Sequence, residues 1–264
     1  FDPTDWESVY REFLLDQNLA QFAAFVLSPH TRALDAAIAG YRDELGLDTE
    51  AALLTEFERE PAVREAAAAY HGGGAGQYAL TDSTTMGLGL LYGGLTLREG
   101  QEILTTTHDH YSTATSLQLR AARTGAKLHQ ISLYQKPATA SQEEIVDTLV
   151  KAVQPRTRVV AVTWVHSSTG VKLPIRRMAE ALATINATRS EADRVLLCVD
   201  GVHGFGIENV HLADLGCDFF IAGCHKWIFG PRGTGIVWGK PEAWPLATEI
   251  IPSFSLEAYR AWLQ

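Results

Sequence analysis

The amino-acid sequence predicts an α/β protein whose mostly parallel sheet carries helices on both faces. From Gln77 onward, short β-branched apolar segments alternate with segments whose apolar residues have helical spacing. This alternation is typical of βαβ units in a parallel sheet. Segments 159–162 and 195–197 are apolar at every position, as expected of strands covered on both sides. The fold class we expect is therefore a three-layer α/β fold, in which one mostly parallel sheet lies between two layers of helices.

Composition agrees with one large globular protein and excludes several functions. The chain has 264 residues, 46% of them hydrophobic and 20% charged, and a net charge of −9. Without a basic block it offers no surface for nucleic acid, and its apolar runs are too short to span a membrane. Its three cysteines form no C-x-x-C pair, which excludes a disulfide framework and predicts a cytoplasmic protein.

Residues 1–75 are expected to form a helical segment without chemistry. The spacing of apolar residues and the capping signals predict helices over 6–15, 29–45 and 49–70. Ser28 is the expected N-cap of the second helix, with Pro29 in its first turn. The third helix is expected to break or bend near Pro61.

Residues 76–240 are expected to form the large domain, and 241–264 the start of a C-terminal segment. Strands are predicted over 78–81, 102–106, 127–133, 158–165, 195–199, 218–222 and from 236 onward. Helices are predicted over 84–95, 112–124, 141–153 and 174–186. Ser141 and Glu144 have the spacing of a capping box.

Polar residues gather where the predicted strands end, which is where open α/β sheets bind ligands. Ser83, Thr84 and Thr85 follow the first strand and open a helix. Hydroxyls and backbone amides at a helix N-terminus suit a phosphate group. Simple helix capping, for which Asp82 or Ser83 suffices, is the alternative.

Two further strand ends carry rings and a carboxylate. His108 and His110 follow the strand 102–106, where they could stack on a cofactor ring, bind a metal or lie in solvent. Asp200 ends a fully apolar strand and needs a cationic partner, which a protonated pyridine nitrogen, a salt bridge or a helix cap would provide. His203 lies three residues beyond it, and Ser167 follows the strand 158–165.

Lys226 follows the strand 218–222 and precedes a glycine-rich turn and another apolar run. A buried lysine is costly unless it is paired, deprotonated or covalently bound, and a neutral lysine can form a Schiff base with an aldehyde. A solvated lysine in a hairpin loop is the simpler alternative. Together the strand ends meet the four requirements of pyridoxal phosphate: a phosphate site, a stacking ring, a carboxylate for the ring nitrogen and a Schiff-base lysine.

From about Tyr78 to Trp238 the sequence resembles the class V branch of fold-type I pyridoxal-phosphate enzymes. This branch includes cysteine desulfurases, kynureninases and isopenicillin-N epimerase-like proteins. The segments His-Lys-Trp (225–227) and Gly-Pro-Arg-Gly-Thr-Gly (230–235) are most similar to the epimerase-like group. The resemblance implies a pyridoxal-phosphate-binding large domain, a homodimer, and a C-terminal small domain that is largely absent from this truncated chain.

The resemblance also implies a role for each candidate residue. Lys226 would hold the cofactor and move the substrate's α-proton, and Asp200 would pair with the pyridine nitrogen. His110 would be the ring that stacks on the cofactor, with His108 as the alternative. His203 and Ser167 would contact the ring hydroxyl. The phosphate contacts would come from Ser83, Thr84, Thr85 and His225. Ser167 stands where asparagine is common in the family.

The leading hypothesis is an enzyme that forms a Schiff base with an amino acid or a similar small amine and breaks a bond at Cα, by lyase or epimerase chemistry. Aminotransferase and oxygen-dependent oxidase or monooxygenase chemistry are alternatives, because the residues that orient the substrate decide which bond breaks. A metallohydrolase using His108, His110, Asp200 and His203 is a second hypothesis, but it leaves Lys226 without a role. The leading hypothesis requires no metal.

Overall fold

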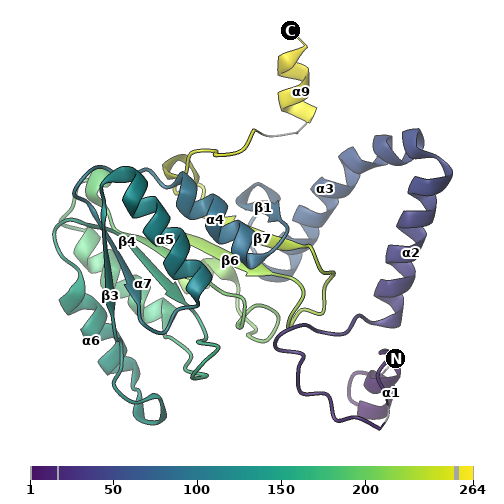
Figure 1. Ribbon diagram of the computed structural model, residues 1–264, viewed down its shortest axis with the longest axis horizontal. Coiled ribbons are helices and arrows are strands. Elements are labelled where there is room, and N and C mark those ends of the chain that lie inside the picture. Colours follow the sequence, from purple (N-terminus) through teal and green to yellow (C-terminus); the bar gives the residue numbers. More distant parts are fainter. Residues whose placement is uncertain (1, 17, 253–255, 264) are drawn as a thin grey trace.

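The computed structural model describes residues 2–16, 18–252 and 256–263, and its centre is one sheet (Figure 1). Seven strands in this part of the chain pair in the order β1-β7-β6-β5-β4-β2-β3. Their bounds are β1 Tyr78–Thr81, β2 Glu102–Thr106, β3 Lys127–Ile131, β4 Thr157–Thr163, β5 Leu196–Asp200, β6 Phe219–Gly223 and β7 Gly235–Gly239.

The sheet is mostly parallel, as the sequence predicts. Strands β3, β2, β4, β5 and β6 pair in parallel, whereas β7 is antiparallel to both β6 and β1. Strands β6 and β7 therefore form a hairpin whose connection, residues 224–234, contains Lys226. The parallel strands all end at the same edge of the sheet, so the polar residues that follow them are brought together.

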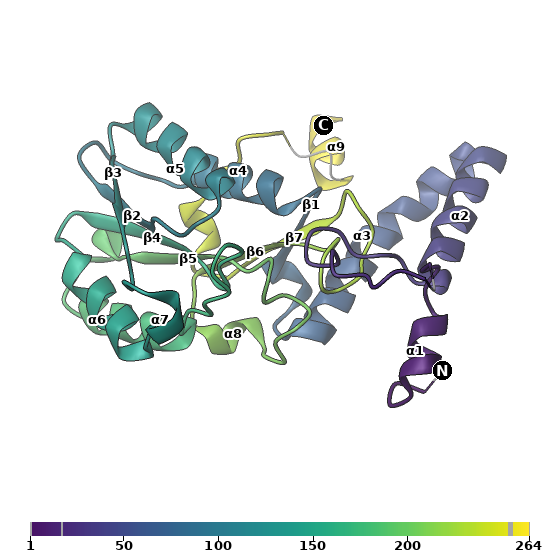
Figure 2. The ribbon, with the colours of Figure 1, turned by 60° about the horizontal axis from the view of Figure 1, so that its bottom comes forward.

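Helices cover both faces of the sheet, which confirms the expected three layers (Figure 2). Val160 and Val162 of β4 pack in one apolar cluster with α6 Gln142–Ala152, α7 Ile175–Asn186 and α8 Leu212–Leu215. Val159 and Ala161, which point to the opposite face, pack in a second cluster with α4 Thr84–Gly94 and α5 Tyr111–Thr124. The two clusters explain why residues 159–162 of β4 are apolar at every position.

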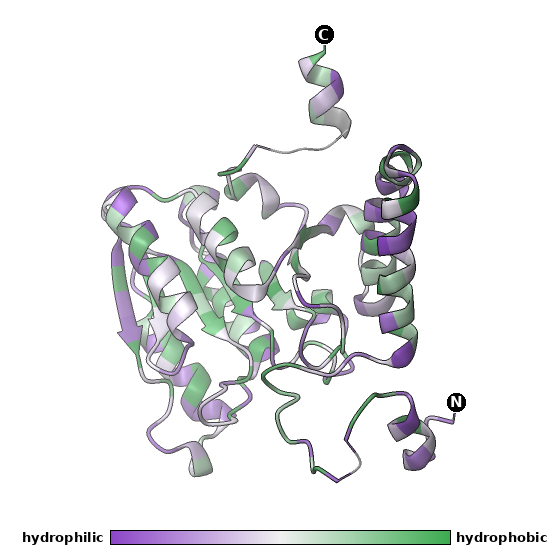
Figure 3. Cartoon of the chain, turned by 45° about the vertical axis from the view of Figure 1, so that its right-hand side comes forward, coloured by the Kyte–Doolittle hydropathy of each residue, from purple (hydrophilic) through white to green (hydrophobic). Residues whose placement is uncertain are grey.

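Burial decreases from the centre of the sheet to its edge. Every residue of β4, β5 and β6 is buried, whereas none of β3 is. The hydropathy colouring shows this contrast, with green central strands and a largely purple edge strand (Figure 3). Strands β3 and β4 both end two residues earlier than predicted, because pairing ends at Ile131 and Thr163.

The N-terminal region is helical, as expected, and α2 and α3 form a pair that extends away from the sheet (Figure 1). Its helices are α1 Trp6–Arg11, α2 Arg32–Leu47 and α3 Thr49–His71. Short 3-10 helices lie further along the chain, at 75–77, 137–139, 191–193 and 244–246. The expected break at Pro61 is not present, since α3 is one helix. The helix is largely exposed, so water can reach the carbonyl group that proline leaves without a donor.

One predicted N-cap is wrong, and one predicted capping box forms only in part. The N-cap of α2 is Thr31, whose Oγ1 accepts a hydrogen bond from the Leu34 N–H at 3.2 Å, and not Ser28. Ser28 is instead held by a residue far along the chain, which the local sequence does not show. At α6, the Ser141 hydroxyl accepts the Glu144 N–H and caps the helix as predicted. The Glu144 carboxylate accepts from the Gln135 N–H and not from the Ser141 N–H, so only half of the expected capping box forms.

The expected C-terminal segment, 241–264, leaves the sheet after β7 and includes α9 Leu256–Trp262 (Figure 1). Residues 253–255 and 264 of this segment lie outside the described residues. Within the described chain no helix is both long and apolar enough to cross a membrane.

Candidate active site

Lys226 is half-buried in the loop between β6 and β7 and lies beside His203. Its Nζ is 3.3 Å from Nε2 of His203, and the other ring nitrogen of His203, Nδ1, accepts a hydrogen bond from the Trp227 indole N–H at 3.1 Å. Burial lowers the pKa of Lys226, although Asp200 acts in the opposite direction. Burial also lowers the pKa of His203 to about 4, helped by the positive charges of Lys226 and His110. A lowered lysine pKa favours the neutral amine, which is the form that a nucleophilic lysine requires.

Asp200, the last residue of β5, is 2% exposed. Its Oδ1 accepts the Val202 N–H at 3.2 Å, and its Oδ2 lies 3.5 Å from the Thr113 hydroxyl. Burial raises the pKa of Asp200 to about 6, and Asp109 adds to the rise. Among the described residues, no lysine, arginine or histidine forms an ion pair with it. The salt bridge considered as an alternative from the sequence is therefore not found within the described chain.

His110 is the N-cap of α5 and bonds within the first turn of that helix. Its Nδ1 accepts the Ser112 N–H at 3.4 Å and lies 2.8 Å from the Ser112 hydroxyl. The pKa of His110 is lowered by burial and then by the charge of Lys226. The ring is thus anchored through one nitrogen at the edge where β2 and β5 end.

Asp109 holds the end of β2 against the end of β4. Its Oδ2 accepts from the Thr105 hydroxyl and the Thr106 N–H, both at 2.8 Å, and its Oδ1 accepts the Thr163 N–H at 2.7 Å. These bonds fix the backbone that leads into His110. The sequence analysis gave Asp109 no role of its own, because its bonding partners are spread over two strands.

The predicted phosphate turn is formed where α4 meets the end of β6. Ser83 caps α4 by accepting the Met86 N–H at 3.1 Å, and the Thr84 hydroxyl accepts the Gly223 N–H at 2.8 Å. A Cβ on Gly223 would lie 2.9 Å from the His225 ring and 3.0 Å from Thr84 Oγ1. Glycine is therefore required where these groups meet. Both hydroxyls accept in these bonds, so their O–H groups can still donate to an anion, together with the N–H groups of the first turn and exposed Thr85.

The structure places His108 in a different environment from His110. Its ring stacks on Tyr134 with centroids 4.2 Å apart and planes 4° apart, and its Nε2 is 3.2 Å from the Ser132 hydroxyl. The Tyr134 hydroxyl in turn bonds His166 Nδ1 at 2.8 Å, and burial lowers the pKa of His166 to about 4. Within the described chain, no three His, Cys, Asp or Glu side chains are placed to hold a metal ion. The metallohydrolase hypothesis thus lacks the convergence it requires.

Ser167 lies in an exposed turn beyond β4, and its side chain makes no hydrogen bond within the described chain. The structure does not join it to the group formed by Lys226, His203 and Asp200. Its expected contact with a ring hydroxyl remains a prediction.

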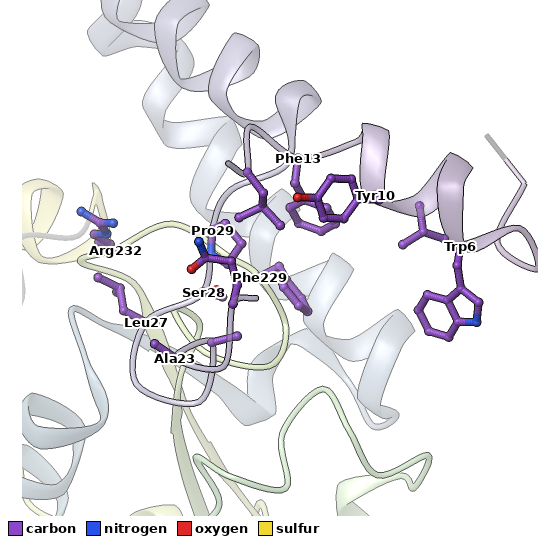
Figure 4. A pocket seen from close by; sticks show the side chains of 13 residues that line it. Trp6, Tyr10, Phe13, Ala23, Leu27, Ser28, Pro29, Phe229 and Arg232 are labelled. Atoms are coloured by element: carbon purple, nitrogen blue, oxygen red, sulfur yellow. The ribbon is translucent and has the colours of Figure 1, made fainter. Parts of the chain in front are cut away.

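The N-terminal segment packs against the lysine loop, a contact that sequence reasoning missed. The Ser28 N–H and hydroxyl both donate to the His225 carbonyl oxygen, at 2.9 and 3.0 Å. Beside this contact lies a pocket of about 520 Å³, lined by apolar residues of the segment, by Phe229 and by Arg232 (Figure 4). Lys226 does not line this pocket, which is therefore adjacent to the lysine site and separate from it.

A buried carboxylate and a half-buried lysine at neighbouring strand ends of a three-layer α/β sheet are typical of domains that bind a ring-shaped cofactor through a lysine. The chain belongs to the aminotransferase class-V family, whose model matches residues 62–256. This confirms the family expected from the sequence.

Two curated relatives illustrate the range of the family. The chain is 28% identical over 241 residues to an isopenicillin N epimerase of Streptomyces clavuligerus, covering 90% of this chain and 57% of that protein. It is 29% identical over 216 residues to a cysteine desulfurase of Klebsiella pneumoniae, covering 78% of this chain and 50% of that protein. The chain thus spans between half and three fifths of these relatives.

Solved structures share the fold of this chain. A cysteine desulfurase from Thermococcus onnurineus matches with a TM-score of 0.76 at 20% identity, over 95% of this chain and 62% of that one. A variant of C-DES, with glycine covalently linked to its PLP cofactor, matches with a TM-score of 0.79 at 22% identity, over 88% of this chain and 59% of that one. At these identities the likeness establishes the fold.

Proposed function

We propose that this chain is the cofactor-binding part of a pyridoxal-phosphate-dependent enzyme that acts on an amino acid or a similar small amine. The observation that carries the proposal is the pair formed by Lys226 and Asp200. An amine with a lowered pKa lies near a fully buried carboxylate that has no ion-pair partner among the described residues. Burying a carboxylate in this way is costly unless a cation pairs with it in the working protein.

The residues of the site fit the cofactor part by part. Lys226 would hold it through a Schiff base, and Asp200 would accept a hydrogen bond from the protonated ring nitrogen. His110 would stack on the ring, and His203 would contact the ring hydroxyl. The phosphate would lie at the first turn of α4, near His225, where Gly223 lets His225 and Thr84 pack closely against the end of β6. When bound, the cofactor supplies an electron sink for a bond broken at the substrate's Cα.

The chain's own residues then have distinct tasks. Lys226 would hold the cofactor through its neutral amine, which its lowered pKa favours. The same amine would accept or donate a proton at the substrate's Cα. A cation next to Asp200 would stabilise its charged form, which burial disfavours by raising the pKa of this carboxyl group to about 6.

We propose lyase or epimerase chemistry for the substrate step. The family relatives named above include a cysteine desulfurase and an epimerase, and cysteine or another small amino acid is therefore the substrate class to test first. Aminotransferase chemistry is the second candidate, supported by the family to which the chain belongs. We also propose a homodimer, which sedimentation of the purified protein would test, and a cytoplasmic location, in keeping with three cysteines that form no disulfide.

The visible absorption spectrum before and after borohydride tests the proposal. We expect a violet-blue band that borohydride bleaches, and peptide mapping should then find the reduced cofactor on Lys226. Lys226→Ala should abolish both the band and the covalent label, whereas Lys172→Ala, which removes an exposed lysine paired with Glu208, should change neither. A Lys226→Ala protein that still converts its substrate would refute the proposal.

A further inference from the structure

The indole of Trp227 makes a buried polar contact that the proposed function does not explain. Its N–H donates to Nδ1 of His203 at 3.1 Å, and Nε2 of the same ring lies 3.3 Å from Nζ of Lys226. All three side chains are half-buried. Trp227, His203 and Lys226 thus form a row in which the imidazole joins the indole to the amine.

The chemistry of the row determines where its protons lie. An indole N–H can only donate, so the Nδ1 of His203 must be an acceptor and carries no proton. Burial lowers the pKa of His203 to about 4, so the ring is neutral at physiological pH and its one proton is on Nε2. That N–H points at the amine of Lys226. An ammonium group has three donors and no acceptor, whereas a neutral amine has a lone pair that can accept.

We propose that Trp227 is a positioning residue that fixes His203 in its Nε2–H tautomer, and through it favours the neutral amine of Lys226 over the ammonium form. The value of this arrangement for catalysis rests on the proposed function, because a neutral amine is the form that attacks an aldehyde. The arrangement of protons itself is a property of the chain alone, and it can be tested without cofactor.

The other influences on the protonation of Lys226 oppose one another. Asp200, at the end of β5, favours the ammonium form, whereas burial disfavours it. His110, before α5, and His225, next to Lys226 in the loop, are both neutralised by burial and by the lysine's own charge. The direct contact with His203 therefore helps to decide between opposing effects of Asp200 and burial.

Nuclear magnetic resonance of protein labelled with ¹⁵N-histidine tests the tautomer directly. In the wild-type protein we expect His203, assigned by comparison with His203→Ala, to show a protonated Nε2 and an unprotonated Nδ1. Trp227→Phe should shift the Nδ1 resonance or produce a mixture of tautomers. Trp244→Phe is the matched control, because its buried indole N–H has no partner among the described residues, and it should leave His203 unchanged. A wild-type His203 protonated on Nδ1 would overturn the proposal, whether or not the variants fold.

The second measurement is the pH dependence of Lys226 labelling by an amine reagent in cofactor-free protein, followed by mass spectrometry. Losing one hydrogen bond to the neutral amine should raise the labelling midpoint in Trp227→Phe by about half to one pH unit. If Trp227 acts through His203, the same substitution should have no effect in a His203→Ala background. An unchanged midpoint in folded Trp227→Phe refutes the proposal. Because no cofactor is present, this result is independent of whether borohydride fixes a cofactor on Lys226.

Discussion

Asp200 gives an opportunity to separate stability from function. Without a cation beside it, the ionised carboxylate is held in a site that disfavours charge, and burial raises its pKa from 3.8 to about 6. One pKa unit corresponds to about 1.4 kcal/mol, so the ionised group destabilises the folded cofactor-free protein by about 3 kcal/mol. Asp200→Asn keeps the size and removes the charge. We therefore expect this variant to be more stable than the wild type at pH 8, by up to about 3 kcal/mol.

The stability advantage of Asp200→Asn increases with pH over a defined range. Between pH 3.8 and about 6 the folded state binds more protons at Asp200 than the unfolded state, so this residue's contribution to stability falls as pH rises. Above about pH 6 both states are ionised and the cost is constant. The advantage of Asp200→Asn should therefore be small at pH 4 and complete by pH 7.

Urea unfolding of cofactor-free protein at pH 4, 6 and 8 measures this difference. Asp218→Asn is the matched control, because Asp218 is also buried but pairs with Arg194 and Lys240 and accepts the Leu197 N–H at 2.8 Å. Breaking a buried pair should destabilise by about 3–5 kcal/mol. If Asp200→Asn were no more stable than wild type at pH 8, or its advantage did not vary with pH, the reasoning about Asp200 would be wrong.

Two further substitutions address the groups around the lysine loop, and a third addresses the packing beneath Asp200. Gly223→Ala would place a Cβ 2.9 Å from the His225 ring, and we expect it to weaken pyridoxal-phosphate binding at least tenfold in a titration while the circular dichroism spectrum is unchanged. Ser28→Ala removes one of two hydrogen bonds to the His225 carbonyl, so it should lower the stability of this contact by about 0.5–1.5 kcal/mol. Limited proteolysis should then cleave the N-terminal segment faster than in the wild type, and equal cleavage rates would contradict this. Gly201→Ala would place a Cβ 1.9 Å from the Phe220 ring, so we expect the free energy of unfolding, measured in urea, to fall by about 1–3 kcal/mol. An unchanged free energy of unfolding would contradict this packing.

The layers of the fold could be predicted from the sequence because they depend on local pattern. Residues 159–162 of strand β4 are apolar at every position, and this pattern already implies helices on both sides. The order of the strands could not be predicted in the same way. Placing β7 between β1 and β6, antiparallel to both, depends on pairing between segments far apart in the chain.

Part of the site could also be predicted from local pattern, because several of its residues lie at strand ends. Lys226, Asp200 and Thr84 follow strands, so their position at one edge follows from the topology. The different environments of His108 and His110 could not be predicted, because His108 is held by stacking on Tyr134. Hydrogen bonds between distant residues leave no periodic signal in the sequence.

The contact between Ser28 and His225 also bears on the order in which the protein folds. The two residues are 197 positions apart, so during synthesis the N-terminal segment leaves the ribosome long before its partner exists. Closing so long a loop is favourable only after the intervening sheet has formed, since the entropic cost must be met by contacts made earlier. We therefore expect the N-terminal segment to remain exposed until β6 is in place, and the lysine loop to be among the last parts of the molecule to become ordered.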